Sequence, residues 1–316
     1  MFLNIIFLVL GFVVLIKGAD LFVDGASSLA RVFKLSTMFI GLTIVSFGTS
    51  APEFAISVSS ILTKNPDMVL GNVIGSNILN ILLIIGVSST IHSLGVKSNT
   101  VKKELPITLL LTILFIVLVS DELFGVSKNM FTRQDGVILL LFFTVFVYYL
   151  ISMLFNRNNS NTAEPPKYSL KKSLLLSVIG VASIIVGSNL VVNNASSIAS
   201  ILGVSQRMIS LTIVALGTSL PELVTSVMAT SKGEYDIAIG NVVGSNIFNL
   251  GIVLALPVAL FGGINHIVFS NIDLIALGVS ALLLFIFSFN DRKINKYEGA
   301  FMIILFFTYY LYVTIL

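Results

Sequence analysis

Two glutamates, Glu53 and Glu222, occupy the same place in two near-copies of one apolar motif. The first copy reads Gly-Leu-Thr-Ile-Val-Ser-Phe-Gly-Thr-Ser-Ala-Pro-Glu over residues 41–53. The second reads Ser-Leu-Thr-Ile-Val-Ala-Leu-Gly-Thr-Ser-Leu-Pro-Glu over residues 210–222. A carboxylate in a segment that belongs in lipid is costly, so it is a functional candidate by default. Brought face to face, the two glutamates would make one site for a cation.

Each copy is followed, at the same distance, by a second matching stretch. Residues 71–80 read Gly-Asn-Val-Ile-Gly-Ser-Asn-Ile-Leu-Asn, and residues 240–249 read Gly-Asn-Val-Val-Gly-Ser-Asn-Ile-Phe-Asn. Polar residues recur every four positions in both, which places them in one stripe along a helix. The two predicted stripes are Asn72, Ser76 and Asn80, and Asn241, Ser245 and Asn249.

A proline directly precedes each glutamate, at Pro52 and Pro221. Proline removes a helical hydrogen bond and leaves the carbonyl four residues earlier without its donor. At membrane depth such a carbonyl is tolerated only inside protein or against a polar cavity. Hydroxyl side chains stand one or two turns earlier: Ser46, Thr49 and Ser50 in the first copy, and Thr218 and Ser219 in the second, where Ala215 replaces Ser46.

Together these groups supply carboxylate, hydroxyl, amide and backbone oxygens. Such hard ligands suit Ca²⁺ and Na⁺ and do not suit soft transition metals. The chain has no cysteine and only two histidines, which excludes the usual zinc and copper sites. An empty site with both glutamates ionised is strongly disfavoured in lipid. We therefore expect the site to move across the membrane only when loaded, which is the physical basis of obligatory exchange.

The elements that must position these residues are membrane spans. Hydrophobic residues make up 56% of the chain and charged residues 10%, whereas a soluble domain has roughly 25% charged residues. Runs of about 20 apolar residues predict transmembrane helices. We expect an all-α integral membrane protein with ten such helices, at residues 2–24, 37–62, 68–91, 104–120, 134–155, 171–195, 206–230, 235–261, 268–289 and 297–316.

A polar stretch divides these spans into two sets of five. It predicts a first repeat over residues 1–155, a linker over 156–170 and a second repeat over 171–316. Basic residues in alternate loops number 13 against 4, so by the positive-inside rule the linker is cytoplasmic and both termini are outside. Equivalent spans are five apart, and an odd separation reverses their direction. The halves therefore form an inverted repeat, a layout common among secondary transporters.

The residues alone leave the mode of transport open. A glutamate that carries a proton would make a Ca²⁺/H⁺ or other cation/H⁺ antiporter. Paired glutamates could also form the filter of a cation channel. An enzyme is a remote alternative, because Ser50 and Ser219 have no histidine or lysine base in an equivalent span.

The motifs at residues 48–53 and 71–77, with their second copies, resemble the two alpha repeats of the sodium/calcium exchanger family, in the calcium/cation antiporter superfamily. The resemblance extends over essentially the whole chain. It is closest to compact prokaryotic members, which lack a large cytoplasmic regulatory domain. It implies a ten-helix fold in the cell membrane, with four ion sites in a diamond at mid-membrane. It also implies exchange of three Na⁺ for one Ca²⁺, with no cofactor, no enzymatic activity, no nucleic acid and no protein partner.

The resemblance also implies residue roles. Glu53 and Glu222 would flank Ca²⁺, with backbone oxygens of Thr49 and Thr218, and Asn80 and Asn249 would lie at the centre. One Na⁺ site would be lined by Ser46, Thr49, Glu53 and Ser76, and the other by Ala215, Thr218, Glu222 and Ser245. Supporting roles would fall to Ser50, Ser219, Pro52, Pro221, Asn72 and Asn241.

Departures from the family pattern refine this expectation. Some members carry an aspartate where this chain has Asn80 or Asn249, and potassium-dependent relatives rely on such an acid in the second repeat. Asn249 therefore favours K⁺-independent exchange. The proton-coupled branch has an additional acid in the second stretch, and the regions of Asn72 and Asn241 supply none. Ser46 stands where alanine is commoner and adds a hydroxyl to one Na⁺ site.

Overall fold

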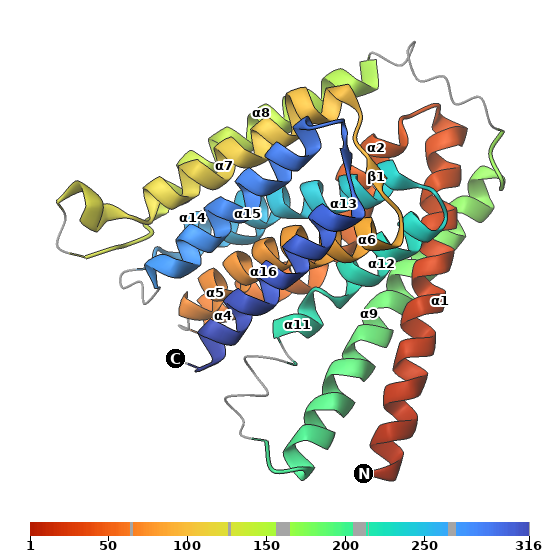
Figure 1. The fold of residues 1–316 in the computed structure, drawn as a ribbon, viewed down its shortest axis with the longest axis horizontal. Coiled ribbons are helices and arrows are strands. Elements are labelled where there is room, and N and C mark those ends of the chain that lie inside the picture. The colour runs from red at the N-terminus through yellow and green to blue at the C-terminus, as the bar shows by residue number, and fades with distance from the viewer. Residues whose placement is uncertain are drawn as a thin grey trace.

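The computed structural model is an all-helical protein, as predicted (Figure 1). It describes residues 1–63, 66–125, 128–155, 165–204, 213, 215–264 and 270–315. Within these ranges the strands are β1 (Leu94–Gly95) and β2 (Lys293–Ile294), which form one short antiparallel pair. Helices dominate because a backbone in lipid must satisfy its hydrogen bonds within its own segment.

In the described part of the chain, six helical stretches are long and apolar enough to cross a membrane: Phe2–Phe33, Met68–Ile91, Arg133–Phe155, Leu170–Ile201, Tyr235–Phe261 and Asn271–Phe289. A bent pair, Thr37–Thr49 with Ala51–Leu62, makes a seventh if it counts as one span. In the first part of the chain the elements are α1 (Phe2–Phe33), α2 (Thr37–Ile40), η1 (Gly41–Val45), α3 (Ser46–Thr49), α4 (Ala51–Leu62), α5 (Pro66–Leu79), η2 (Asn80–Ile85), α6 (Gly86–Ile91), η3 (Thr100–Glu104), α7 (Leu105–Leu118), η4 (Asp121–Phe124) and α8 (Arg133–Phe155).

In the second part they are α9 (Leu170–Ile201), α11 (Ala215–Thr218), α12 (Leu220–Ser231), α13 (Tyr235–Phe248), η7 (Asn249–Leu254), α14 (Ala255–Phe261), α15 (Asn271–Phe289) and α16 (Lys296–Ile315). Residues 156–164 of the predicted linker and the start of the predicted span 206–230 lie outside the described residues.

Both segments that carry a glutamate are broken helices. The backbone leaves the helix at Ser50, with φ −82° and ψ 5°, and at Ser219, with φ −94° and ψ 9°. The first break bends the chain by 47°. Pro52 and Pro221 then stand in the first turn of α4 and α12, where a missing N–H is tolerated. The predicted interruption is thus present, and it falls on the serine two residues before each proline.

The two polar stretches share a second irregularity. A π-helical segment begins at Asn80 in η2 and at the equivalent Asn249 in η7. Such wide turns are rare and often lie at functional sites. The sequence pattern predicts regular helices here, because a period of four residues carries no sign of a π turn.

The first helix is longer than predicted. The expected span ends at residue 24, and α1 continues to Phe33. Its later turns make polar contacts with the α12–α13 connection: Asp24 pairs with Lys232 at 2.7 Å, and Arg31 pairs with Glu234 at 3.0 Å. Asp24 also pairs with Lys167, and this hydrogen bond raises the pKa of Lys167.

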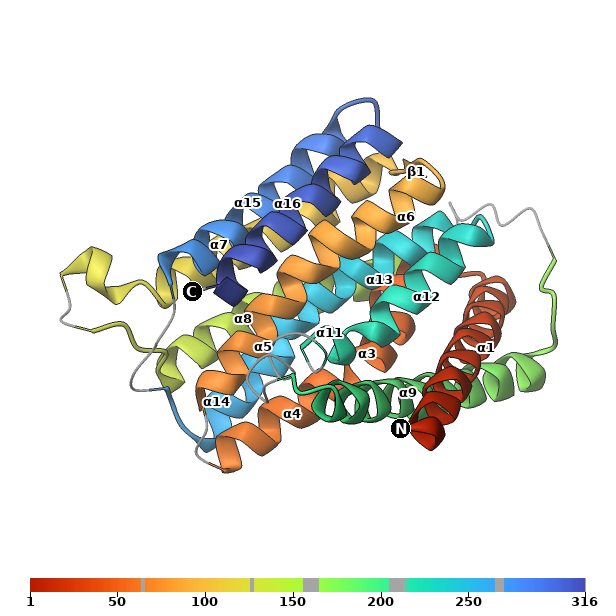
Figure 2. The same ribbon diagram turned by 60° about the horizontal axis from the view of Figure 1, so that its bottom comes forward.

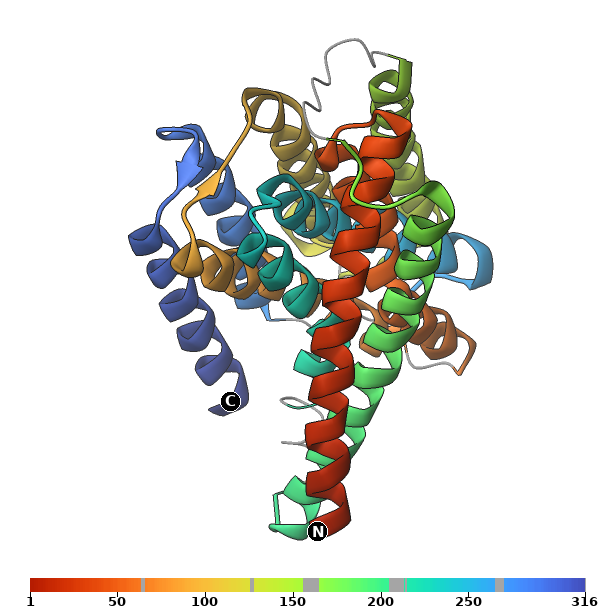
Figure 3. The same ribbon diagram turned by 90° about the vertical axis from the view of Figure 1, so that its right-hand side faces the viewer.

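Helices α1 and α9 lie side by side along most of their length (Figure 3). Glycines at the seam allow the close approach, as in many membrane helix pairs. A Cβ added to Gly187 would lie 2.6 Å from the backbone nitrogen of Leu15, and one added to Gly180 would lie 2.7 Å from the Cα of Phe22. The two backbones are therefore in direct contact.

The other long helices form a second group. In Figure 2, α5–α6, α13–α14, α15 and α16 run diagonally next to one another, and α1 and α9 lie to one side. One hydrophobic core joins α5, α7, α8, α13, α14 and α15, and a smaller core joins α1 to residues around Ile40 and Ile237. Gly48 of the first broken helix faces Phe22 and Val181 of the α1–α9 pair. The broken helices thus lie where the two groups meet.

The seam yields a stability prediction. Replacing Gly180 with Val should lower the free energy of unfolding by about 1–3 kcal/mol, because the new side chain forces α1 and α9 apart. Thermal unfolding in detergent would measure this. Ala182→Val, on the exposed side of α9, is the matched control. Equal unfolding temperatures for the two variants would contradict the close packing.

Candidate cation site

The two glutamates are held by serines of the opposite half of the chain. The Ser219 hydroxyl donates to Oε1 of Glu53 at 3.2 Å and lies 3.2 Å from the Ser76 hydroxyl. In the same way Ser50 donates to Oε1 of Glu222 at 3.1 Å and lies 3.0 Å from Ser245. Both glutamates are 1% exposed. The breaks at Ser50 and Ser219 place these hydroxyls across the interface between the halves.

Among the buried side-chain oxygens of the described residues that lack a hydrogen-bond partner, four belong to the carboxylates and amides of this region. They are Oε2 of Glu53 and of Glu222, and Oδ1 of Asn80 and of Asn249. A buried acceptor left unpaired costs about 1–3 kcal/mol, and more for a charged group. All four atoms are oxygen acceptors of the kind that a hard cation takes as ligands. They form two pairs related by the duplication.

Asn80 and Asn249 are held by two further asparagines, Asn246 and Asn77, which were not among the predicted site residues. Asn80 donates through Nδ2 to Oδ1 of Asn246, and Asn249 donates through Nδ2 to Oδ1 of Asn77, both at 3.0 Å. Asn77 and Asn246 are duplicated in the sequence, directly after Ser76 and Ser245. The four-residue spacing predicts the stripe only, and Asn77 and Asn246 lie outside it. Their presence in both copies of the motif is the sequence signal that could have identified them.

Asn72 and Asn241 brace the backbone of the two glutamates. The Nδ2 of each donates to the carbonyl of Glu53 or Glu222 at 3.4 Å. Asn241 also donates to the Ser226 hydroxyl at 2.9 Å. The members of each predicted stripe therefore have different roles. The first members hold α4 and α12, and the last members each carry a buried amide oxygen without a donor.

The other residues predicted to line the Na⁺ sites differ in burial and in hydrogen bonding. Thr49 is buried and donates to Oδ1 of Asn241 at 3.0 Å. Ser46 donates to the carbonyl of Thr43 at 3.3 Å, and its hydroxyl lies against Gly244 of α13. Thr218 is half-buried, and the side chain of Ala215 lies outside the described part of the chain.

The donor set fits a hard cation. Among the described residues, no group of three or more His, Cys, Asp or Glu side chains is placed to hold a metal ion. The site instead combines two carboxylates with hydroxyl and amide oxygens. Oxygen-only sets of this kind suit Ca²⁺ and Na⁺.

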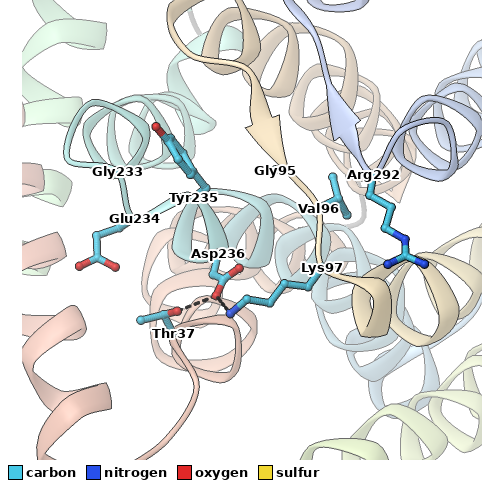
Figure 4. A pocket seen from close by; sticks show the side chains of 9 residues that line it. All are labelled: Thr37, Gly95, Val96, Lys97, Gly233, Glu234, Tyr235, Asp236 and Arg292. Carbon is cyan, nitrogen blue, oxygen red and sulfur yellow. Dashed lines mark hydrogen bonds and ion pairs between the residues drawn. The ribbon is translucent and has the colours of Figure 1, made fainter. Parts of the chain in front are cut away.

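A cavity of about 430 Å³ lies elsewhere, among the loops (Figure 4). Its wall includes Asp236, which accepts from Thr37 at 2.8 Å and pairs with Lys97. The acid is thus already neutralised. Below it, α13 and η1 are in close contact, since a Cβ on Gly41 would lie 3.0 Å from the Cα of Gly240. The residues that line the cavity include neither Glu53 nor Glu222, so we do not assign the cation site there.

Comparisons with known proteins agree with this geometry. The family model described as sodium/calcium exchanger protein matches residues 3–152 and 172–315. CaxA of Alkalimonas amylolytica, a protein named as an antiporter, is 37% identical over 317 residues, which is 96% of each chain. The sodium/calcium exchanger MaX1 of Methanosarcina acetivorans is 31% identical over 96% of this chain and 99% of its own. A structure of the sodium-calcium exchanger NCX_Mj, soaked with Na⁺, superposes with a TM-score of 0.84 at 33% identity, covering 97% of each chain.

The crossed serines generate a binding prediction. Ser219→Ala should weaken equilibrium Ca²⁺ binding by roughly tenfold, about 1.4 kcal/mol, because Glu53 loses the donor that orients it. Ser50→Ala should do the same through Glu222. Calorimetry on the purified protein would measure both, with the exposed Ser231→Ala as control. If both variants bind Ca²⁺ as tightly as the control, the serines do not organise the site.

Proposed function

The chain belongs to the sodium/calcium exchanger family, and from this premise we propose that it is a Na⁺/Ca²⁺ antiporter that works by alternating access. The observation that carries the proposal is the set of four unpaired buried oxygens on Glu53, Glu222, Asn80 and Asn249. The match to NCX_Mj over almost the whole chain supports it. The protein is a multi-pass membrane protein, and its family is one of transporters.

We propose ten spans in two inverted halves, with a cytoplasmic linker and both termini outside the cell membrane. The family model supports this division, because it matches the chain twice, on either side of residues 153–171. The equal spacing of the two breaks and the two π segments supports it as well. The count reaches ten when the broken helices are single spans and the helical stretch Thr100–Leu118 and α16 are included.

The proposed ion positions follow the unpaired atoms. Ca²⁺ would lie between Oε2 of Glu53 and Oε2 of Glu222, with the backbone oxygens of Thr49 and Thr218. The Na⁺ sites would use Ser46, Thr49, Glu53 and Ser76 on one side, and Ala215, Thr218, Glu222 and Ser245 on the other. The carbonyl oxygens of Asn80 and Asn249 would face the centre.

Charge explains why transport would be an exchange. Two ionised glutamates carry about −2 in a buried site, which one Ca²⁺ or a group of Na⁺ ions neutralises. Moving the unloaded site across the membrane would cost much free energy, because its charge would be uncompensated inside the membrane. With three Na⁺ for one Ca²⁺, one net charge crosses in each cycle, worth about 2.3 kcal/mol per 100 mV. An inside-negative potential would then favour Ca²⁺ export.

The main prediction concerns coupling. Proteoliposomes loaded with Na⁺ and diluted into Na⁺-free medium should take up radioactive Ca²⁺, because outward Na⁺ flow drives inward Ca²⁺ flow. Uptake that persists at the same rate after the Na⁺ gradient is collapsed would sink the antiport proposal. A pH gradient that fully replaces the Na⁺ gradient would favour a Ca²⁺/H⁺ antiporter, and single-channel currents would favour a channel.

Variants of the proposed site residues should lose Ca²⁺ uptake, whereas a variant of an acid away from the site should keep it. Glu53→Ala and Glu222→Ala should abolish Na⁺-driven Ca²⁺ uptake, because each removes one of the two charges that hold the ion. Asp24→Ala should retain most of the uptake, since Asp24 pairs with Lys167 and Lys232 away from the buried glutamates. Comparable losses in all three variants would argue against the assignment.

The neutral residue at 249 gives a further prediction. We expect Na⁺-driven Ca²⁺ uptake at the same rate with K⁺ or with choline on both sides of the membrane, because the site centre has an amide at Asn249 where a K⁺ ligand would need a carboxylate. A rate that falls to background without K⁺ would show potassium dependence.

A further inference from the structure

Four buried asparagines form a ring between the two halves of the chain. Hydrogen bonds close the ring across the interface, and the helical backbone closes it within each half, from residue 77 to 80 and from 246 to 249. Asn80 donates to Asn246, and Asn249 donates to Asn77, through side-chain bonds of 3.0 Å. Asn77 and Asn246 in turn donate to each other's backbone carbonyls at 3.4 and 3.3 Å. Each of the four side chains is at most 1% exposed. Every hydrogen bond in the ring crosses from one half to the other.

The ring decides which way each amide faces. An asparagine side chain carries a donor on one side and an acceptor on the other. The backbone bonds use the Nδ2 atoms of Asn77 and Asn246, so these residues present their Oδ1 atoms to Asn249 and Asn80. An acceptor there can pair only with the Nδ2 of its partner. The Oδ1 atoms of Asn80 and Asn249 are consequently turned away from the ring, and both lack a donor.

We propose that Asn77 and Asn246 are positioning residues that keep the carbonyl oxygens of Asn249 and Asn80 directed toward the transported cation. This inference rests on the proposed function and adds two residues to its site. Without the ring, either amide could rotate and present an –NH₂ group to a positive ion. The π-helical turns begin at Asn80 and Asn249 themselves, and they belong to the local geometry that brings each amide to its partner in the other half.

The pairing is specific and therefore testable. Asn246 acts on Asn80, and Asn77 acts on Asn249. A purely structural role for the ring would lower stability without any such preference. Double-mutant cycles distinguish the two, because residues that act through one another give non-additive effects and independent residues give additive ones.

The experiment measures equilibrium Ca²⁺ binding to the purified full-length protein by calorimetry. Asn246→Ala and Asn80→Ala should each weaken binding by about tenfold, and the double variant should bind no more weakly than Asn80→Ala alone. Asn246→Ala combined with Asn249→Ala should weaken it more than either change alone, since Asn249 is not the residue that Asn246 orients. Asn194→Ala is the matched control, because its amide donates to Leu190 on the same helix.

The outcomes are distinct. Additive losses in the Asn80 pair would overturn the inference and leave the antiporter proposal untouched, whereas a wild-type protein that binds no Ca²⁺ would overturn the proposed function itself. If the alanine variants fail to fold, Asn246→Asp is informative, since its carboxylate still accepts from Asn80. Binding no more than threefold weaker than wild type supports the ring's role, and a larger loss contradicts it.

Discussion

The burial of two carboxylates at membrane depth is the constraint around which the rest of the structure is arranged. Glu53 and Glu222 are each 1% exposed, and each has one oxygen bound to a serine and one without a donor. Such groups are tolerated only where the protein prepares partners for them. The breaks in both helices, the serines at these breaks and the asparagine ring all supply polar groups to this one region. The surrounding helices are apolar because lipid is their solvent.

Neither half of the chain is complete by itself. Ser219 orients Glu53, Ser50 orients Glu222, and the asparagine bonds likewise cross between the halves. This exchange of contacts explains why a duplication preserves serine and asparagine at matched positions. It also makes the site a property of the interface, so a relative shift of the two halves would alter every ligand position together.

The helices around this polar centre pack with their backbones in close contact. Glycines bring α1 against α9, and Gly41 meets Gly240 where α13 passes η1. Glycine contacts suit a membrane protein, because lipid provides no hydrophobic drive for helices to associate and close van der Waals contact has to supply it. The ion pairs of Asp24 and Arg31 add polar links between α1 and the α12–α13 connection. These charges are neutralised by partners, unlike the unpaired oxygens of the candidate cation site.

The sequence by itself determined the all-helical membrane class, the family, and most of the residues that gather at the centre, because duplication and the cost of a charge in lipid are visible in a linear pattern. Glu53, Glu222, Ser50, Ser219, Asn80 and Asn249 were all predicted from it. Only the tertiary structure decided how these residues pair. The crossed serines and the role of Asn77 and Asn246 depend on contacts between segments about 170 residues apart, and on π turns that change which side chains face each other. Helical periodicity describes one helix at a time, so it cannot specify a ring built from two.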